Sequence, residues 1–207
     1  SGGLDSILTA NYVKSKLRYE KLVVLFFDYG QRNVNIERKF SKKCAYDLNA
    51  RFFEIKLHEL KEISSSLINN SSKARKIRIK KLREKISKNE SKRFYVPNRN
   101  AIFLSYATAL AEKFKGNWDI FVGFTNEGIE AYPDTTPKFV SKMNELMKVI
   151  GLKGSIIAPL IKKDKSEVIK LSLKLGINLS NTYSCYIGVK DNRHCGTCLA
   201  CRLRLLF

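Results

Sequence analysis

The sequence has few acidic residues and lacks any long apolar run. Its 19 Asp and Glu residues face 39 Lys and Arg residues, so the formal net charge is +20. This excess favours anionic partners such as nucleotides or RNA, although lysine-rich surfaces also occur in thermophile proteins that bind no nucleic acid. No apolar run approaches the roughly 20 residues of a membrane helix, which predicts a soluble protein with no membrane partner.

Internal repeats and a signal-peptide pattern are also absent, and only five residues are cysteine. A chain of 207 residues with 44% hydrophobic residues can bury the core of one domain. These features predict a cytoplasmic protein, in a compartment where disulfides are rare.

The first six residues, Ser1-Gly2-Gly3-Leu4-Asp5-Ser6, are suited to cradling a phosphate. Two glycines allow a tight turn, so that amide and hydroxyl hydrogens face an anion at the start of a helix. A Ser-Gly-Gly stretch is also common in flexible loops and helix caps. Apolar residues at helical spacing follow, and they favour the phosphate interpretation. Asp5 falls in the first turn, where a carboxylate suits the helix dipole or holds Mg²⁺.

Four cysteines near the other end form the pattern C-x9-C-x2-C-x2-C: Cys185, Cys195, Cys198 and Cys201. With Gly196 giving backbone freedom between two of them, this spacing fits a structural zinc site whose four thiolates leave no open position. The alternative is a pair of disulfides. His194 is a possible substitute for one thiolate, and the leftover Cys44 is predicted to be a small core residue of a helix.

Alternating strands and helices indicate an α/β protein with a parallel sheet covered on both faces. The expected strands are 22–27, 51–57 and 120–123, and the expected helices after the first are 37–48, 100–114, 143–150 and 165–175. Ligands of such sheets bind beyond the carboxyl ends of the strands. Segments 28–32 and 125–127 and the opening loop are therefore predicted to meet at one site.

Residues 64–93 interrupt this alternation with a strongly basic stretch. Eleven Lys and Arg residues oppose only Glu84 and Glu90, and a weak apolar stripe predicts a short basic helix. The simplest interpretation is a solvated charged surface. RNA contact, or steering of an anionic substrate, is the alternative.

Six motifs, in the same order along the chain, resemble those of the 7-cyano-7-deazaguanine synthase family. The members of this family are zinc-containing ATP pyrophosphatases. The resemblance covers nearly the whole chain, through residues 1–6, 27–32, 96–100, 132–134 with Phe139, 159–160 with Lys165, and 184–186 with 195–201. Asn98 stands where the family's Val-Pro-Gly-Arg-Asn turn has glycine. Both residue types tolerate a left-handed backbone.

The resemblance implies a doubly wound parallel sheet, like that of adenine nucleotide alpha hydrolases, in residues 1–160. A helical zinc-binding region, residues 161–207, would pack on it. The implied cofactors are ATP, Mg²⁺ and Zn²⁺, and the implied substrates are 7-carboxy-7-deazaguanine and ammonia. The implied reaction passes through an acyl adenylate and an amide to the nitrile, a precursor of queuosine and archaeosine.

Residue roles follow from the same resemblance. The loop residues that hold pyrophosphate and magnesium are Ser1, Gly2, Gly3, Asp5 and Ser6. Arg99 and Lys165 join Asp5 and Ser6 as catalytic residues that contact phosphate or carboxylate, the alternative for each being a surface ion pair. Tyr132 stacks on the base unless it is a core aromatic, and Asp134 accepts hydrogen bonds from the guanine-like edge.

Two other functions are compatible with the sequence. One is a related enzyme with the same loop that modifies RNA or protein directly. The other is a non-catalytic, zinc-bearing RNA-binding protein, which would bind RNA without ATP turnover. A homodimer and weak RNA contact are further expectations.

Overall fold

The structure is a computed structural model that describes residues 1–69, 92–114, 116–126, 132–188, 193–196 and 198–205. Most of the basic segment 64–93, including the helix expected there, lies outside these residues. The elements in order are α1 (Leu4–Ser15), β1 (Val23–Asp28), α2 (Val34–Asp47), β2 (Arg51–Lys56), α3 (Glu59–Glu62), α6 (Arg99–Glu112), β3 (Asp119–Phe121), η1 (Pro133–Thr135), α8 (Pro137–Val149), β4 (Ser155–Ile157), α9 (Lys165–Lys174), η2 (Leu179–Asn181) and α10 (Leu199–Leu205).

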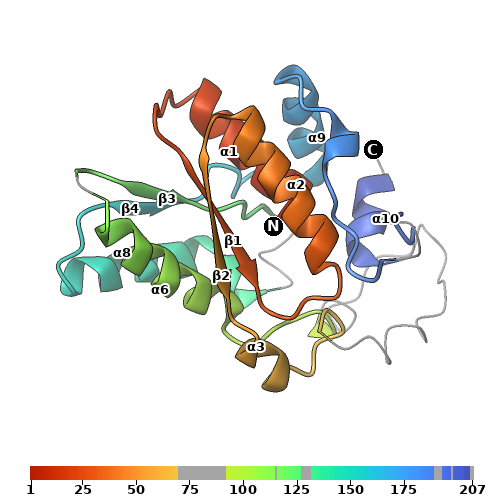
Figure 1. Cartoon of the computed structure of the whole chain (residues 1–207), viewed down its shortest axis with the longest axis horizontal. Coiled ribbons are helices and arrows are strands. Elements are labelled where there is room, and N and C mark those ends of the chain that lie inside the picture. Colours follow the sequence, from red (N-terminus) through yellow and green to blue (C-terminus); the bar gives the residue numbers. More distant parts are fainter. Residues whose placement is uncertain (70–91, 115, 127–131, 189–192, 197, 206–207) are drawn as a thin grey trace.

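The strands form two parallel pairs (Figure 1). Strand β1 pairs with β2 from Val23 opposite Arg51 to Asp28 opposite Lys56, and β3 pairs with β4. Parallel strands and an α/β architecture were predicted and are confirmed. One continuous, doubly wound sheet is not seen, because β1 and β3 line a common cavity and are not hydrogen-bonded to each other within the described residues.

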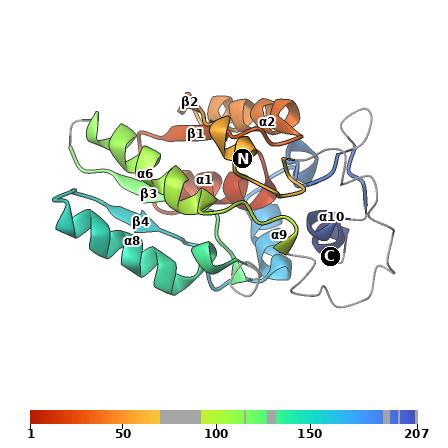
Figure 2. The ribbon, with the colours of Figure 1, turned by 90° about the horizontal axis from the view of Figure 1, so that it is seen from below.

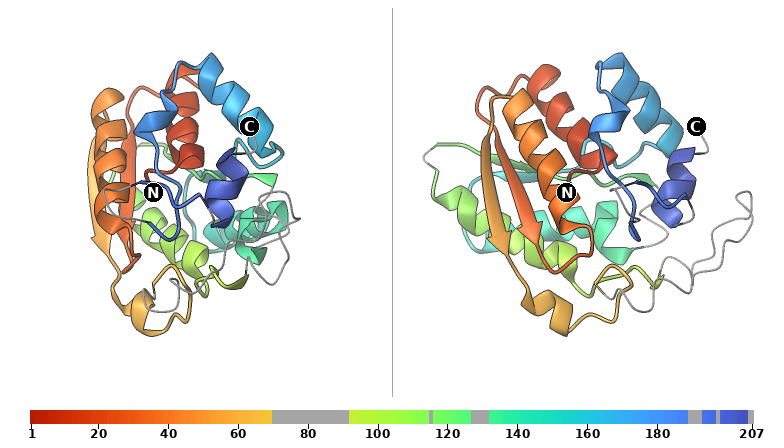
Figure 3. Two further views of the ribbon diagram at one scale, coloured as in Figure 1. Left: turned by 90° about the vertical axis from the view of Figure 1, so that its right-hand side faces the viewer. Right: turned by 45° about the vertical axis from the view of Figure 1, so that its right-hand side comes forward.

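Helices cover both strand pairs. Figure 2 shows α2 along β1 and β2 at one side of the molecule and α8 along β4 at the opposite side. Helix α1 contacts α2, α9 and β3, so it packs against helices on one side and against a strand of the second pair on another. Leu8, Leu160 and Val168 are fully buried in the core between α1 and α9, and Cys44 packs in the same core as predicted. Figure 3 shows the N-terminus beside the chain that follows α9 and η2, where the amide of Tyr183 donates to the carbonyl oxygen of Gly2.

Six of the expected elements match the structure to within three residues at each end, whereas α8 starts earlier and α3, β4, η1 and η2 were not expected. Helix α8 begins at Pro137, six residues before the expected start, because Thr136 caps it: its Oγ1 accepts a hydrogen bond from the amide of Phe139 at 3.1 Å. Strand β4 was not expected, because its three residues are defined by their pairing with β3, more than thirty positions away in the sequence. Within the described residues, no helix combines the length and apolarity needed to cross a membrane.

Candidate active site and metal centre

The opening loop leads directly into α1 and is packed from two sides. Gly2 has a φ of 66°, and a Cβ there would lie 2.5 Å from the carbonyl oxygen of Glu37 in α2. A Cβ on Gly123, just after β3, would lie 2.9 Å from the carbonyl carbon of Asp5. Glycine is therefore required at both positions, because the loop backbone touches neighbouring backbone there.

The polar groups of the loop contact each other and one lysine. The Oγ atoms of Ser1 and Ser6 are 2.7 Å apart. Asp5 Oδ1 accepts a hydrogen bond from Nζ of Lys165 at 2.7 Å, and only 12% of the lysine side chain is exposed. Lys165 is the first residue of α9, so this ion pair joins two predicted catalytic residues across the α1–α9 contact. A pair this sheltered is not an ordinary surface ion pair.

The segments predicted to meet at one site do so around a cavity of about 1210 Å³. Five of the loop's six residues line it: Ser1, Gly3, Leu4, Asp5 and Ser6. The other predicted segments contribute Tyr29, Gln31, Thr125, Asn126, Arg99 and Lys165. The expected convergence is therefore confirmed for the described residues. Glu127, the end of the predicted 125–127 segment, lies outside them. The cavity also extends between β1 and β3, whose apolar side chains form part of its wall.

Arg99 brings a positive charge to the cavity. It follows Asn98, whose φ of 52° confirms the predicted left-handed backbone. Its guanidinium carbon lies 5.6 Å from the ring centre of Tyr29, and Nη1 donates to the Tyr29 hydroxyl at 3.4 Å. Burial lowers the pKa of Arg99, but the neighbouring Tyr29, Tyr186 and Asp134 outweigh this and raise it. None of the ion pairs among the described residues involves Arg99, so its charge is available to an anionic ligand.

The two predicted substrate residues occupy different positions. Tyr132 lines the cavity, and burial raises its pKa. Asp134 is buried, and its Oδ2 accepts a hydrogen bond from the backbone amide of Asn100 at 3.3 Å, in the first turn of α6. Asp134 thus supports the start of the helix that carries Arg99. Its contact with a substrate stays a prediction.

Glu37 and Tyr186 are among the cavity residues that were not predicted as site residues. Glu37 lies in the cavity wall, accepts a hydrogen bond from Nε2 of Gln31 at 3.3 Å, and has its pKa raised by burial. A single carboxylate near the start of a helix gives no sequence signal for such a position. Tyr186 also lines the cavity. In the sequence, the position of Tyr186 next to Cys185 indicated only that it belongs to the metal-binding region.

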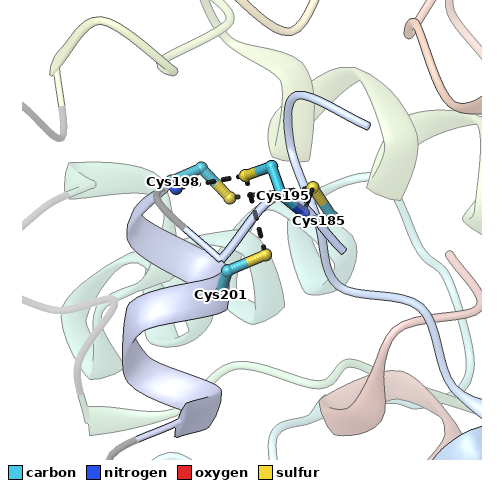
Figure 4. Close-up of side chains that lie close together, drawn as sticks. All are labelled: Cys185, Cys195, Cys198 and Cys201. Atoms are coloured by element: carbon cyan, nitrogen blue, oxygen red, sulfur yellow. Dashed lines mark hydrogen bonds between the residues drawn. The ribbon is translucent and has the colours of Figure 1, made fainter. Parts of the chain in front are cut away.

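The four C-terminal cysteines form a compact cluster (Figure 4). Their sulfur atoms all lie within 4.8 Å of one another. The Sγ atoms of Cys195 and Cys201 are 3.9 Å apart and those of Cys185 and Cys198 are 4.0 Å apart. These separations far exceed the ~2.05 Å of a disulfide. They approach the roughly 3.8 Å expected between thiolates arranged tetrahedrally at ~2.3 Å around one ion.

Backbone amides surround the sulfur atoms. Cys185 Sγ accepts from the amide of Gly188 at 3.1 Å, Cys195 Sγ from that of Cys198 at 3.3 Å, and Cys198 Sγ from that of Tyr186 at 3.4 Å. Such donors stabilise thiolates around a metal. His194 instead faces the amide of Ser184 and is not part of the cluster. The four cysteines can therefore hold a metal ion without it.

The comparisons with known proteins agree with these features. The model of the family described as "Queuosine biosynthesis protein QueC" matches residues 1–206. The chain belongs to this family. It is 37% identical to the 7-cyano-7-deazaguanine synthase of Nitratiruptor sp. over 99% of this chain and 89% of that protein. It is 36% identical to those of Rickettsia canadensis and Methanococcus maripaludis, over 99% of this chain and 90% and 89% of theirs.

Proposed function

We propose that this protein converts 7-carboxy-7-deazaguanine, ammonia and ATP into 7-cyano-7-deazaguanine, a precursor of queuosine and archaeosine. The observation that carries the proposal is the single cavity in which the opening loop, Arg99 and Lys165 meet. A glycine loop at a helix start is suited to a pyrophosphate, and two cations beside it are suited to the phosphates and to a carboxylate substrate. The chain's relatives in the QueC family bear the name of this synthase.

The first step activates the carboxylate. One of its oxygens attacks the α-phosphorus of ATP, the bond from that phosphorus to the bridging oxygen breaks, and pyrophosphate leaves. The product is an acyl adenylate. Amides of the Gly2–Gly3 turn, together with Ser1 and Ser6, would hold the departing pyrophosphate. Asp5 would hold Mg²⁺, which supplies charge neutralisation when bound, and Arg99 and Lys165 would oppose the remaining negative charge.

Ammonia then attacks the acyl carbon, AMP leaves, and an amide is formed with loss of one proton. A second ATP activates the amide oxygen in the same way, again releasing pyrophosphate. Loss of AMP and of protons from nitrogen leaves the nitrile. Each nitrile therefore consumes two ATP. The protein contributes positioning and electrostatics at the same cavity in both activations.

The ring of the substrate would stack on Tyr132 and have its guanine-like edge oriented by Asp134. Both assignments rest on the family motif, and the position of Tyr132 in the cavity wall supports the first. The four-cysteine cluster would bind Zn²⁺, because four thiolates at near-tetrahedral spacing are the ligand set that structural zinc prefers.

Exchange of labelled pyrophosphate into ATP tests this proposal at its first step. Exchange is expected when the protein is given 7-carboxy-7-deazaguanine and Mg-ATP without ammonia, and no exchange is expected without the acid. Exchange that RNA stimulates and that does not depend on the free acid would instead identify a related enzyme acting on RNA.

A further inference from the structure

The segment Tyr183–Tyr186 connects the cysteine cluster to the opening loop. The amide of Tyr183 donates to the carbonyl oxygen of Gly2 at 2.8 Å. Ser184 Oγ lies 3.5 Å from the amide nitrogen of Leu4, from which it accepts a hydrogen bond. The next residue, Cys185, is a member of the cluster. A metal ligand and two direct contacts with the loop therefore lie within three consecutive residues.

A third contact fixes the ligand residue itself. Asn33, the residue before α2, donates from Nδ2 to the carbonyl oxygen of Cys185 at 2.7 Å. Asn33 and Ser184 both line the cavity. Helix α2 also packs on the loop, through the close approach of Glu37 to Gly2. The loop, the start of α2 and the segment around Cys185 thus form one closed set of contacts.

This segment is irregular, although its side chains also pack in the core: Tyr183 is buried, and the ring of Tyr186 lies 4.9 Å from that of Phe94. Residues 182–188 form neither helix nor strand, and the nearest elements are the three-residue η2 and the seven-residue α10. Cys185 is nearly fully buried, and the following amide, that of Tyr186, is directed at Cys198 Sγ. An irregular segment keeps one conformation only where its contacts define it. Among those contacts, the backbone bonds to the loop lie on one side of the segment and the cluster lies on the other.

We infer that the four-cysteine metal centre is a positioning element for the pyrophosphate loop, and not only a stabiliser of the C-terminal region. Metal bound at Cys185 fixes segment 183–186, which in turn holds Gly2 and Leu4 in the geometry that receives the phosphates of a nucleoside triphosphate. The inference rests on the proposed function for both the metal and the nucleotide. By linkage, ATP must tighten metal binding by the same factor by which metal tightens ATP binding.

The first test removes hydrogen bonds that link segment 183–186 to the loop and to α2, and it leaves the four cysteines unchanged. Asn33→Ala and Ser184→Ala are compared with Asn178→Ala, which removes a cap of similar size from η2 in the same region. ATP affinity is measured by calorimetry and zinc content by elemental analysis. We expect both test variants to keep one zinc per chain and to bind ATP about three- to tenfold more weakly, the effect of one lost hydrogen bond. The control should bind ATP as the wild type does.

The second test uses the wild-type protein, so it does not depend on how the variants fold. Its zinc affinity is measured by competition with a zinc-selective chelator, with and without saturating ATP, after correction for zinc bound by ATP alone. Tighter zinc binding in ATP is expected. Equal zinc affinity in both conditions, or full ATP affinity in both zinc-loaded test variants, would overturn the inference. Wild-type protein that binds no ATP or no zinc would overturn the proposed function itself.

Discussion

The opening loop and the cysteine cluster are linked by the segment Tyr183–Tyr186, and they are built in opposite ways. The loop works through its backbone: Gly2 and Gly123 are needed because no side chain fits between neighbouring chain segments. The cluster works through its side chains, with four sulfur atoms inside a region of short elements. Substitutions that add side-chain atoms are therefore expected to disrupt the loop, and substitutions that remove a sulfur atom are expected to disrupt the cluster.

The largest effect is expected from removing one sulfur atom. Cys198→Ala should abolish zinc binding and lower the free energy of unfolding by about 4 kcal/mol or more, since metal binding is coupled to folding. Elemental analysis and thermal unfolding measure this. The control is Cys44→Ala, which deletes a buried sulfur outside the cluster and should keep its zinc. Undiminished zinc in the Cys198 variant would refute the four-thiolate site.

The next effect tests the loop by adding one carbon atom. Gly2→Ala should abolish ATP binding and keep the zinc, because its Cβ would lie 2.5 Å from a backbone oxygen in a left-handed conformation. Gly176→Ala is the matched control, since Gly176 has a φ of 70° but no atom within 4 Å of the added carbon. That variant should lose about 1 kcal/mol of stability and no ATP affinity. Equal ATP affinities of the two variants, measured by calorimetry, would contradict a backbone cradle.

Within the loop, Asp5→Asn tests the chemistry with almost no change in side-chain shape. Asp5→Asn should lower kcat about 10²- to 10³-fold with a smaller change in the KM for ATP, because charge on the phosphates builds up along the reaction path. Asp47→Asn is the control. Asp47 also pairs with a lysine, Lys43, at 2.9 Å, but on an exposed face of α2. An unchanged kcat in the Asp5 variant would remove this residue from the catalytic set.

The smallest effect is expected at Asp28, which belongs to neither region. Burial raises its pKa, but hydrogen bonds from His58 and Gly30 and the charge of Arg38 outweigh burial and hold the pKa below its usual value. A lowered pKa stabilises the fold above the unfolded-state value of about 3.9, and this stabilisation disappears as the pH falls through the folded-state pKa. Asp28→Asn should therefore cost about 1 kcal/mol at pH 7, and this cost should shrink as the pH falls below about 3.9 and through the folded-state pKa, as measured by urea unfolding. A pH-independent difference would contradict this.

Much of the fold could be predicted because its signals are local. The strand at 51–57 and the helix at 165–175 carry their periodicity in the sequence, and they match β2 and α9 closely. The early start of α8 also had a local signal, the Thr136-Pro137 cap, that was not used. Strand β4 had none, because its pairing with β3 depends on residues more than thirty positions away.

The candidate site was predictable where it consists of motifs. The loop, Arg99, Lys165 and the cysteines meet or cluster as their motifs suggested. What could not be predicted is which residues the fold places between motifs. Through the packing of α2, the backbone of Glu37 approaches Gly2 and the side chain of Asn33 reaches Cys185. Asp134 faces the start of α6. Such contacts depend on tertiary packing, and the spacing of residues in the sequence does not indicate them.

The most direct test of the proposed function is the stoichiometry of complete turnover. Zinc-loaded protein is supplied with 7-carboxy-7-deazaguanine, ammonia and Mg-ATP, and the nitrile, AMP and pyrophosphate are quantified by mass spectrometry and chromatography. The proposed function predicts 7-cyano-7-deazaguanine with two AMP and two pyrophosphate for each nitrile, and no ATP consumption without the acid. ADP and phosphate as the nucleotide products, or no nitrile from the free acid, would contradict it.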